Sequence, residues 1–370
     1  MAKRLYIIAG EASGDLHGAN LVRAIRLIDP AVEVRAWGGD RMAAAGAEVV
    51  KHISELAFMG FTEVVMNLRT ITRNLRQCEH DIETWKPDAV VLIDYPGFNL
   101  RIAKHAHRLG IKVIYYIGPQ LWAWKAGRVE TIKRVVDRMM VILPFEKDWY
   151  ARHGVQVDFV GHPLLDAIAE EGTHPLEPLP GDDGRPVIAL LPGSRMQEIT
   201  RMLPVMLRAS APFTQYRSVV AAAPSIPPEA YGELMRGTAA TLLQDRTYDL
   251  LRCATAAVVT SGTATLESAL FGVPEVVCYK GGGLSFAIAK QLVKVPFISL
   301  VNLIMEREVV KELVQTNMNE SSVRAELDRL LNEATYRTRI IADLDELKVR
   351  LGGAGASQKA ASLLWKSLEQ

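Results

Sequence analysis

Polar residues that could carry out chemistry follow directly on short apolar runs of the chain. The first apolar run, residues 5–9, is followed by Glu11, Ser13, Gly14, Asp15 and His17. In open α/β sheets, ligands bind beyond the carboxyl ends of the strands, and the N–H groups at the start of the next helix favour anions. A tight turn in which Ser13 or Asp15 caps a helix would explain one of these residues, but not all of the polar side chains together. We therefore predict that this group forms part of a binding site.

A second carboxylate, Asp94, follows the apolar run 90–93 and precedes Pro96. This spacing predicts that Asp94 faces the same edge of the sheet as the first group. A carboxylate in that position could accept a proton from a hydroxyl group. An ordinary turn-forming Asp would look the same in the sequence, so the motif alone leaves both interpretations open.

Two tryptophans and two cations come after the third of these runs, at Trp122, Trp124, Lys125 and Arg128. Aromatic faces suit a sugar or an acyl chain, and the cations suit a phosphate. The alternative is a packing cluster at the start of a helix. The unusual combination of residue types favours a binding site.

Two loops in the second half of the chain have the composition of phosphate-binding loops. One contains Gly193, Ser194, Arg195 and Glu198, and the other contains Ser261, Gly262, Thr263, Thr265 and Glu267. A strand, a small-residue loop and a helix start can hold phosphates through backbone N–H groups and the helix dipole, although an ordinary capped turn has the same pattern. Arg195 could neutralise a diphosphate, and Glu267 could bind ribose hydroxyls.

Several sequence motifs of other enzyme classes are missing from the chain. Neither loop is a Walker A sequence, and no Gly-x-Gly-x-x-Gly occurs, which disfavours a P-loop NTPase and a dehydrogenase. There is also no His-Glu-x-x-His motif and no obvious group of metal ligands in the sequence. We therefore expect neither a metal nor another cofactor.

An amphipathic segment lies between these motifs. Phe58, Met59 and Phe61 are followed by Arg69, Arg73 and Arg76, whose spacing places the three arginines on one helical face. Such a segment fits the surface of an anionic membrane or an acyl pocket beside a phosphate. Composition alone slightly favours the simpler alternative, an amphipathic helix that packs on the sheet and keeps its arginines in solvent.

The elements that must position these residues follow from the hydrophobic pattern. Short non-alternating apolar runs at residues 5–9, 32–37, 89–93, 113–117, 139–143 and 157–160, and again at 187–191, 218–223, 240–243, 256–259 and 276–279, are separated mostly by segments of helical period. Such runs are typical of strands that are buried on both faces. The alternation predicts parallel α/β domains with helices on both faces of each sheet.

The domain organisation follows from a change in composition. Residues 171–186 are rich in Pro, Gly and Asp and predict a linker between domains 1–170 and 187–340. Residues 341–370 predict C-terminal helices that pack across the domain junction or onto a partner chain, and the second case would give a homodimer.

Charge and cysteine content exclude several classes of protein. The 370 residues carry a net charge of only +1, which disfavours a nucleic-acid partner. The three cysteines, Cys78, Cys253 and Cys278, show no disulfide or zinc pattern, and no apolar run is long enough to span a membrane. We expect a cytoplasmic protein.

Together, the motifs resemble the lipid-A-disaccharide synthases, a family of inverting glycosyltransferases. The matching stretches run nearly from end to end and are Gly10-Glu-Ala-Ser-Gly-Asp-Leu-His17, Trp37-Gly-Gly39, Met59-Gly60, Asp94-x-Pro96-x-Phe98-Asn99, Trp122-Ala-Trp124-Lys125, Leu143-Pro-Phe-Glu146, Val160-Gly-His-Pro-Leu164, Leu191-Pro-Gly-Ser-Arg195, Thr260-Ser-Gly-Thr-Ala-Thr-Leu-Glu267, Val295-Pro-Phe-Ile-Ser-Leu300, and Asn302 with Glu312 and Gln315. The glycine run Gly281-Gly282-Gly283 is not part of the resemblance, and we assign it no role.

The resemblance implies a fold of the GT-B type, with two Rossmann-like domains whose parallel sheets face a central cleft. The first domain would bind the acceptor, 2,3-diacylglucosamine 1-phosphate, and the second the donor, UDP-2,3-diacylglucosamine. The implied products are the β-1',6-linked lipid A disaccharide 1-phosphate and UDP. The enzyme would be peripheral, at the cytoplasmic surface of the inner membrane.

The residues and the resemblance together suggest a role for each site. Asp94 is the expected catalytic base, His17 is the second choice, and Arg195 stabilises the leaving UDP. The donor would be bound by Gly193, Ser194, Arg195, Glu198, Ser261, Gly262, Thr263, Thr265, Glu267, Asn302, Glu312 and Gln315. The acceptor would be bound by Glu11, Ser13, Gly14, Asp15, Phe61, Trp122, Trp124 and Lys125, and the membrane by Phe58, Met59, Phe61, Arg69, Arg73 and Arg76. Two alternatives remain open: a UDP-N-acetylglucosamine 2-epimerase-like enzyme, which would not need the segment around Phe58, and a nucleotide-sugar sensor without catalysis.

Overall fold

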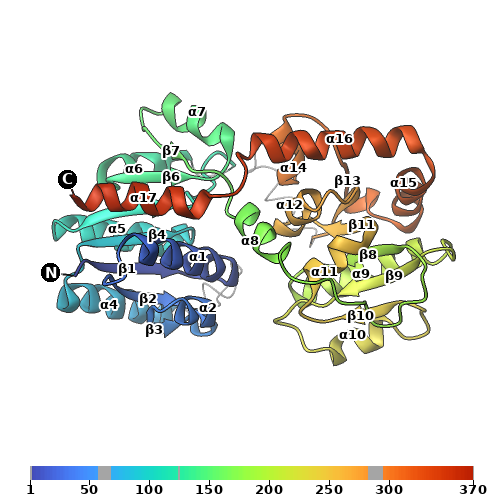
Figure 1. Ribbon diagram of the computed structural model, residues 1–370, viewed down its shortest axis with the longest axis horizontal. Helices are drawn as coiled ribbons and strands as arrows, with labels where there is room; N and C mark the ends of the chain where they lie inside the picture. Colours follow the sequence, from blue (N-terminus) through green and yellow to red (C-terminus); the bar gives the residue numbers. More distant parts are fainter. Residues whose placement is uncertain (1, 57–67, 124–125, 282–294, 370) are drawn as a thin grey trace. The chain divides into compact units, whose positions relative to one another are not determined.

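The computed structural model of the chain describes residues 2–56, 68–123, 126–281 and 295–369. The chain forms two compact units, one made of residues 1–166 and 351–370 and the other of residues 167–350 (Figure 1). Each unit is built around one parallel sheet, as the alternation of apolar runs and helical segments predicts. The chain passes from the first unit to the second between residues 166 and 167 and returns between residues 350 and 351, so residues 171–186 belong to the second unit.

The first unit contains a seven-stranded parallel sheet with the order β3-β2-β1-β4-β5-β6-β7. Its strands are β1 (Arg4–Ala9), β2 (Glu33–Gly38), β3 (Glu48–His52), β4 (Ala89–Ile93), β5 (Lys112–Tyr116), β6 (Arg138–Val141) and β7 (Asp158–Phe159). The central strands β1 and β4 are buried on both faces, which explains why their sequences are continuously apolar.

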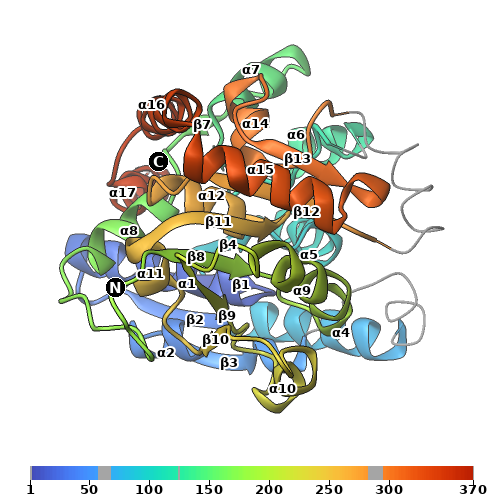
Figure 2. The same ribbon diagram turned by 90° about the vertical axis from the view of Figure 1, so that its right-hand side faces the viewer.

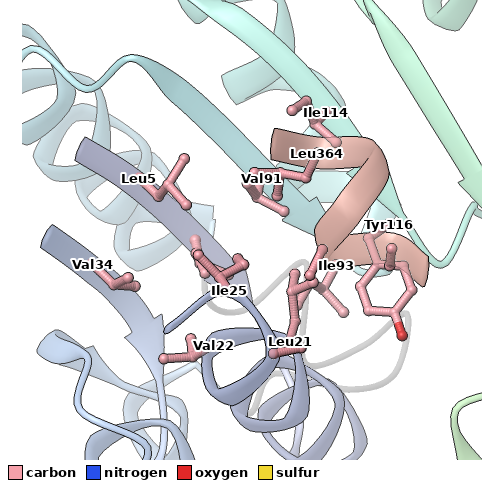
Figure 3. Packing of buried hydrophobic residues seen from close by; sticks show 14 of the residues in the cluster. Leu5, Leu21, Val22, Ile25, Val34, Val91, Ile93, Ile114, Tyr116 and Leu364 are labelled. Carbon is pink, nitrogen blue, oxygen red and sulfur yellow. The ribbon is translucent and has the colours of Figure 1, made fainter. Parts of the chain in front are cut away.

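Helices cover both faces of this sheet. They are α1 (Ala12–Ile28), α2 (Asp40–Ala44), α4 (Leu68–Trp85), α5 (Pro96–Arg108), α6 (Val129–Val135), α7 (Pro144–Arg152) and α17 (Ala356–Glu369), with 3-10 turns at η1 (Ile53–Glu55) and η2 (Ala126–Arg128). Apolar side chains of α1 and α17 pack on one face, which Figure 3 shows around Leu21, Ile93 and Leu364. Side chains of α4, α5, α6 and α7 pack on the opposite face.

The C-terminal helix α17 is an integral part of the first unit. Its Ala360, Ala361 and Leu364 are fully buried in the core. Helix α17 lies beside α1 (Figure 1). The carboxylate of Asp166 accepts hydrogen bonds from the backbone N–H groups of residues 355, 356 and 357 at the start of α17, at 2.5–3.2 Å. At its other end, Lys112 donates to the carbonyl oxygen of Ser367. The predicted tail is therefore split: α16 belongs to the second unit, and α17 covers its own first unit.

The second unit contains a six-stranded parallel sheet with the order β10-β9-β8-β11-β12-β13. Its strands are β8 (Val187–Leu191), β9 (Arg217–Ala221), β10 (Thr241–Leu243), β11 (Ala254–Thr260), β12 (Glu275–Tyr279) and β13 (Lys311–Val314). Its helices are α9 (Met196–Ser210), α10 (Glu229–Leu234), α11 (Thr247–Cys253), α12 (Thr263–Leu270), α14 (Leu300–Met305), α15 (Glu320–Asn332) and α16 (Ala334–Arg350), with a 3-10 turn at η3 (Gln315–Asn317). Helix α8 (Leu164–Glu171) contains the point where the chain passes from the first unit to the second.

Helices lie on both faces of the second sheet as well. Helices α9 and α15 contact each other and pack on strands β8, β11 and β12, and Figure 2 shows α15 lying across this sheet. Helices α11 and α12 contact the same sheet and contribute to a core that contains Leu250 and Leu251. Within the described ranges, no helix combines the length and the apolar character needed to cross a bilayer.

Candidate active site

Four of the segments singled out in the sequence follow the strands at the switch point of each sheet, where neighbouring strands continue into helices on opposite faces. The segment that contains Trp122 follows β5. In the first unit, β1 and β4 are neighbours, and they lead into α1 and α5 on opposite faces. In the second unit, β8 and β11 are neighbours, and they lead into α9 and α12. Ligands of open α/β sheets bind in the crevice at such a point. Each unit therefore has one candidate binding edge, and each carries the predicted residues.

Asp94 lies in a strained turn directly after β4. Its φ is 44° and that of Tyr95 is 48°, so two successive non-glycine residues adopt the left-handed region. The side-chain amide of Asn99 donates to the carbonyl oxygens of Ile93 at 3.1 Å and of Asp94 at 2.7 Å. The Tyr115 hydroxyl also donates to the Asp94 carbonyl oxygen, at 2.6 Å. These bonds from α5 and β5 hold the turn, and with it the carboxyl group, at the edge of the sheet.

The environment of Asp94 suits a base that works near neutral pH. Loss of hydration in the surrounding protein, followed by the negative charge of Glu11, raises the pKa of Asp94 to about 6. Asp94 nevertheless remains exposed to solvent, so it is accessible to a substrate hydroxyl. A base is most effective when its pKa approaches the working pH.

An aromatic stack supports the turn from beside β1. A Cβ atom on Gly10 would lie 2.5 Å from Cγ of Tyr95, so only glycine allows the ring to approach this closely. The Tyr95 ring stacks on Phe98 with centroids 5.5 Å apart, and Phe98 lies 5.3 Å from the Trp37 ring. The two loops at the switch point are therefore packed against each other.

Asp15 serves as an internal cap in this structure. Its buried carboxylate accepts hydrogen bonds from the backbone N–H groups of Gly39 at 2.7 Å, Arg41 at 3.1 Å and Met42 at 3.1 Å. These donors belong to the first turn of α2 and the residue before it, where N–H groups lack partners within the helix. The observed hydrogen bonds of Asp15 join α1 to α2. Its contact with the acceptor stays a prediction.

His17 is buried, and this weakens it as a candidate base. Burial lowers the pKa of His17 to about 4, although Asp166 opposes the shift. The neighbouring His162 is also buried, and its pKa falls to about 3. Of the other predicted residues at the start of α1, Ser13 is exposed and Gly14 is buried. On accessibility and pKa, Asp94 fits the role of base better than His17 does, and both assignments stay predictions.

Trp122 is held by a buried carboxyl group. Its indole N–H donates to Oε1 of Glu146 at 3.1 Å, and its ring meets Phe145 edge-on at 5.0 Å. The other oxygen of Glu146 accepts from the backbone N–H groups of residues 142 and 143 at 3.3 and 2.9 Å. Burial raises the pKa of Glu146 to about 7. Trp124 and Lys125 lie outside the described residues.

In the second unit, the loop after β8 is organised by Glu198. This carboxylate accepts from the backbone N–H of Ser194 at 3.1 Å and from the guanidinium of Arg195 at 3.3 Å. Gly193 has φ 117°, and a Cβ atom there would lie 2.6 Å from Oε2 of Glu198. The Arg195 side chain is 60% exposed. Glu198 therefore shapes the loop, while Arg195 remains accessible to an anion.

The loop after β11 leads into the start of α12. Ser261 donates its hydroxyl hydrogen to the carbonyl oxygen of Ile298 at 3.0 Å, and the buried Thr265 donates to that of Gly262 at 2.9 Å. Gly262 and Thr263 are exposed. The backbone at Gly262 and Thr263 is therefore the accessible part of this loop, and the two hydrogen-bonded hydroxyls stabilise it.

Glu267 has a partner that sequence analysis did not identify. Its carboxyl group accepts a hydrogen bond of 3.0 Å from the hydroxyl of Tyr248, whose ring packs against Phe271. Burial raises the pKa of Glu267. Tyr248 thus orients the carboxyl group that we expect to bind ribose.

Asn302 and Glu312 form a hydrogen-bonded network inside the second unit. Asn302 is fully buried, its Nδ2 donates to Glu312 at 2.9 Å, and its Oδ1 accepts from the backbone of residues 309 and 310. Glu312 also accepts from the backbone N–H groups of residues 298 and 299, both at 2.9 Å. Both side chains thus hold the loops around β13, and direct contact with the donor stays a prediction for them.

Gln315 has two features typical of a ligand-binding position. It follows β13 with φ 55°, and its buried Nε2 has no hydrogen-bond partner among the described residues. A left-handed non-glycine residue and an unsatisfied buried donor are both costly. These costs favour a role for Gln315 in binding.

The predicted membrane segment is only partly described. Phe58, Met59 and Phe61 lie outside the described residues. Arg69, Arg73 and Arg76 are exposed on α4 and, with Thr72, line a shallow depression of about 450 Å³. The opposite side of α4 buries Cys78 and Ile82 in the core, so the expected amphipathic pattern is present.

Several residues at these edges were missed by sequence reasoning. The residues are Asn99, Tyr115, Glu146 and Tyr248, which act on other side chains or on the backbone. Asn99 and Glu146 lie in stretches that match the family, so the sequence could have pointed to these two residues only. No group of three or more potential metal ligands occurs in the part of the chain that the structure describes.

Comparisons with known proteins identify the family. The family model described as lipid-A-disaccharide synthetase matches residues 5–366. The lipid-A-disaccharide synthase of Trichlorobacter lovleyi is 40% identical over 376 residues, covering 100% of this chain and 98% of that protein. The lipid-A-disaccharide synthase of Myxococcus xanthus is 40% identical over 366 residues, with 97% and 96% covered.

Solved structures show the same fold at low identity. A UDP-N-acetylglucosamine 2-epimerase from Neisseria meningitidis bound to UDP-GlcNAc has a TM-score of 0.66 and 12% identity, with 99% of each chain covered. The calicheamicin glycosyltransferase has a TM-score of 0.64 and 18% identity, with 100% of this chain and 99% of that chain covered. These structures confirm the expected GT-B fold, and the family match favours a transferase over the epimerase and sensor alternatives. The chain is therefore a glycosyltransferase that belongs to the lipid-A-disaccharide synthase family.

Proposed function

We propose that the enzyme transfers the diacylglucosamine unit of UDP-2,3-diacylglucosamine to 2,3-diacylglucosamine 1-phosphate. The products are the β-1',6-linked lipid A disaccharide 1-phosphate and UDP. In this proposal the first unit binds the acceptor and the second unit binds the donor. The observation that carries it is the exposed carboxyl group of Asp94, which is held on a strained turn at the switch point and has a raised pKa.

The reaction is a single displacement with inversion. The acceptor 6-hydroxyl attacks the anomeric carbon of the donor, and its proton passes to the ionised carboxylate of Asp94. As the new C–O bond forms, the bond between the anomeric carbon and the diphosphate oxygen breaks. UDP leaves with the bonding electron pair, so negative charge develops on its diphosphate.

Residues of the second unit could stabilise this charge and orient the nucleotide. The exposed guanidinium of Arg195 and the backbone at Gly262 suit the diphosphate. Glu267, oriented by Tyr248, could accept hydrogen bonds from ribose hydroxyls. The unsatisfied amide of Gln315 could donate a hydrogen bond to the donor.

The variant Asp94→Asn tests the proposed base. Asparagine keeps the size of the side chain but cannot take the proton, so we expect turnover to fall by about 10²–10⁴, with the affinity for UDP retained. The matched control is Asp148→Asn, which changes an exposed carboxylate of α7 in the same unit. UDP release in the presence of both sugar substrates measures turnover, and UDP titration measures binding. Turnover near that of the unchanged enzyme would remove Asp94 from the role and favour His17.

The same assay distinguishes the remaining functions. A transferase releases UDP only when the acceptor is present and forms the disaccharide. An epimerase would convert UDP-N-acetylglucosamine without an acceptor, and a sensor would bind the nucleotide sugar without turnover.

We further propose that the enzyme works at the cytoplasmic surface of the inner membrane. Both proposed substrates carry acyl chains, and the arginines of α4 are exposed, where each could add about 1 kcal/mol of attraction to anionic lipid. Replacing Arg69, Arg73 and Arg76 with Gln should reduce sedimentation with anionic vesicles but not with neutral ones. Unchanged sedimentation by the folded variant would leave these arginines as a solvated helix face. Because α17 covers its own unit, it provides no argument for the expected homodimer.

A further inference from the structure

A pocket of about 420 Å³ lies beside the turn that carries Asp94, and none of the roles described above uses it. It is lined by side chains of α4 and α5, of the turn after β4, and of the region where η2 leads into α6. Its apolar wall contains Ile71, Tyr95, Phe98 and Leu100. Phe98 and Leu100 belong to the core and are only 4% and 7% exposed, so this wall is rigid. The pocket therefore offers a preformed apolar surface next to the proposed base.

Three cations complete the lining of the pocket. Arg101 and Lys104 lie one turn apart on α5, and Arg128 belongs to η2. Arg101 and Lys104 are exposed, and neither forms an ion pair within the described ranges. Like charges at this helical spacing repel each other, and a bound anion would relieve the repulsion. The combination fits an amphiphile that has an acyl chain and an anionic group.

We propose that this pocket binds one acyl chain of the acceptor and that Arg101 and Lys104 bind its phosphate. This assignment rests on the proposed function, since it takes the acceptor to be an acylated sugar phosphate. It also explains how a lipid could be held with its sugar beside Asp94, because Tyr95 belongs both to the strained turn and to the pocket wall. The acyl chain then contributes directly to the placement of the reacting hydroxyl.

Gly97 allows the pocket to be filled without disturbing the fold. It lines the pocket, and among the described residues no atom beyond its chain neighbours and its own helix backbone would lie within 4 Å of a Cβ atom there. The variant Gly97→Leu should therefore fold and occupy the space of the acyl chain. Gly232→Leu on α10 is the matched control, because Gly232 also has open space around its Cβ position and lies in the other unit.

The first measurement is the affinity for a series of short-chain acceptor phosphates that are monomeric in solution, without any donor. Each added methylene should tighten binding to the unchanged protein about fourfold until the pocket is full. In Gly97→Leu this dependence on chain length should be lost, with UDP affinity unchanged, and Gly232→Leu should behave like the unchanged protein. A Gly97→Leu variant that keeps the full dependence on chain length would overturn the proposal.

The second measurement tests the phosphate site. Replacing Arg101 and Lys104 together with Gln should weaken binding of the acceptor phosphate at least tenfold, while the same acceptor without its phosphate should bind equally well. Lys366→Gln, an exposed change on α17, is the control. An equal loss for both acceptors, or no loss, would refute the phosphate assignment.

A short-chain phosphatidylglycerol distinguishes the acceptor from ordinary membrane lipid. It should compete weakly with the acceptor phosphate in the direct binding assay. Competition of equal strength would assign the pocket to bilayer lipid and overturn the assignment to the acceptor. Because binding is measured without turnover, failure of the proposed reaction would appear separately, as acceptor binding without UDP release.

Discussion

The buried carboxyl group of Glu146 should make the stability of the first unit depend on pH in a direction unusual for an acid. Glu146 is only 1% exposed, and burial raises its pKa from 4.5 to about 7. Its oxygens accept hydrogen bonds from the indole of Trp122 and from the backbone before α7. The proposed perturbation is Glu146→Gln, which removes the titration and keeps the size of the side chain.

The magnitude follows from the pKa shift. A change from 4.5 to about 7 corresponds to about 3 kcal/mol between the two protonation states. Because the pKa of the folded state is the higher one, folding takes up protons between these values. The stabilising effect of protonation is fully present below pH 4.5 and is lost as the pH rises through about 7.

The stability of the glutamine variant should not depend on this titration. Its amide oxygen can accept a hydrogen bond either from the backbone N–H groups or from the indole of Trp122. Its NH2 group then faces the remaining N–H donor. The variant should therefore be less stable than the unchanged protein at pH 5. The difference in the free energy of unfolding should shrink by about 3 kcal/mol between pH 4.5 and pH 8, because only the unchanged protein carries the buried charge.

Tryptophan fluorescence during urea unfolding is a suitable assay, because all six tryptophans of the sequence lie within the ranges of the first unit. The matched control is Glu130→Gln, which changes an exposed carboxylate on α6. Its difference from the unchanged protein should be the same at every pH. A difference for Glu146→Gln that stays constant from pH 4.5 to 8 would refute the reasoning, since it would mean that Glu146 titrates alike in the folded and unfolded chain.

Two further predictions concern the rate and the C-terminal helix. If Asp94 is the base, as proposed, it must be ionised; since its pKa is raised to about 6, kcat/KM should fall below that pH, and Glu11→Gln should move the fall to lower pH by removing a negative charge. The kcat/KM profile measures this, and an unmoved profile would exclude Glu11 as a cause. Asp166→Ala removes the acceptor for three N–H groups at the start of α17, so we expect a loss of about 2 kcal/mol. The Tm of the first unit should fall by about 4–8 °C, with Asp148→Ala as the unchanged control.

The sequence predicts the central strands correctly and misses two strands at the sheet edges. Continuous apolar runs such as residues 89–93 are recognisable because the strand is buried on both faces. β3 reads Glu-Val-Val-Lys-His and β13 reads Lys-Glu-Leu-Val, and neither is continuously apolar. Both have only one neighbouring strand, so much of each stays accessible to water, and the apolar signal is weak.

The candidate site is predictable in outline because strand ends can be read from the chain. The position of Asp94 after an apolar run was enough to place it at a sheet edge. Its left-handed backbone and its bonds to Asn99 and Tyr115 depend on elements that meet only in the folded unit. The return of α17 to the first unit is similar, because a face of small apolar residues such as Ala360 could equally pack on a partner chain.

Asp94 and Glu146 are two acids of the first unit whose pKa values are both raised, but different consequences are expected from them. Burial is the largest cause of both raised pKa values, and the negative charge of Asp94 adds to the raised pKa of Glu146. The charge that opposes ionisation of Asp94 comes from Glu11. Under the proposed mechanism, the pH dependence of catalysis is therefore expected to depend on Asp94 and Glu11, whereas the charge of the buried Glu146 beside Trp122 is expected to lower the stability of the first unit at higher pH.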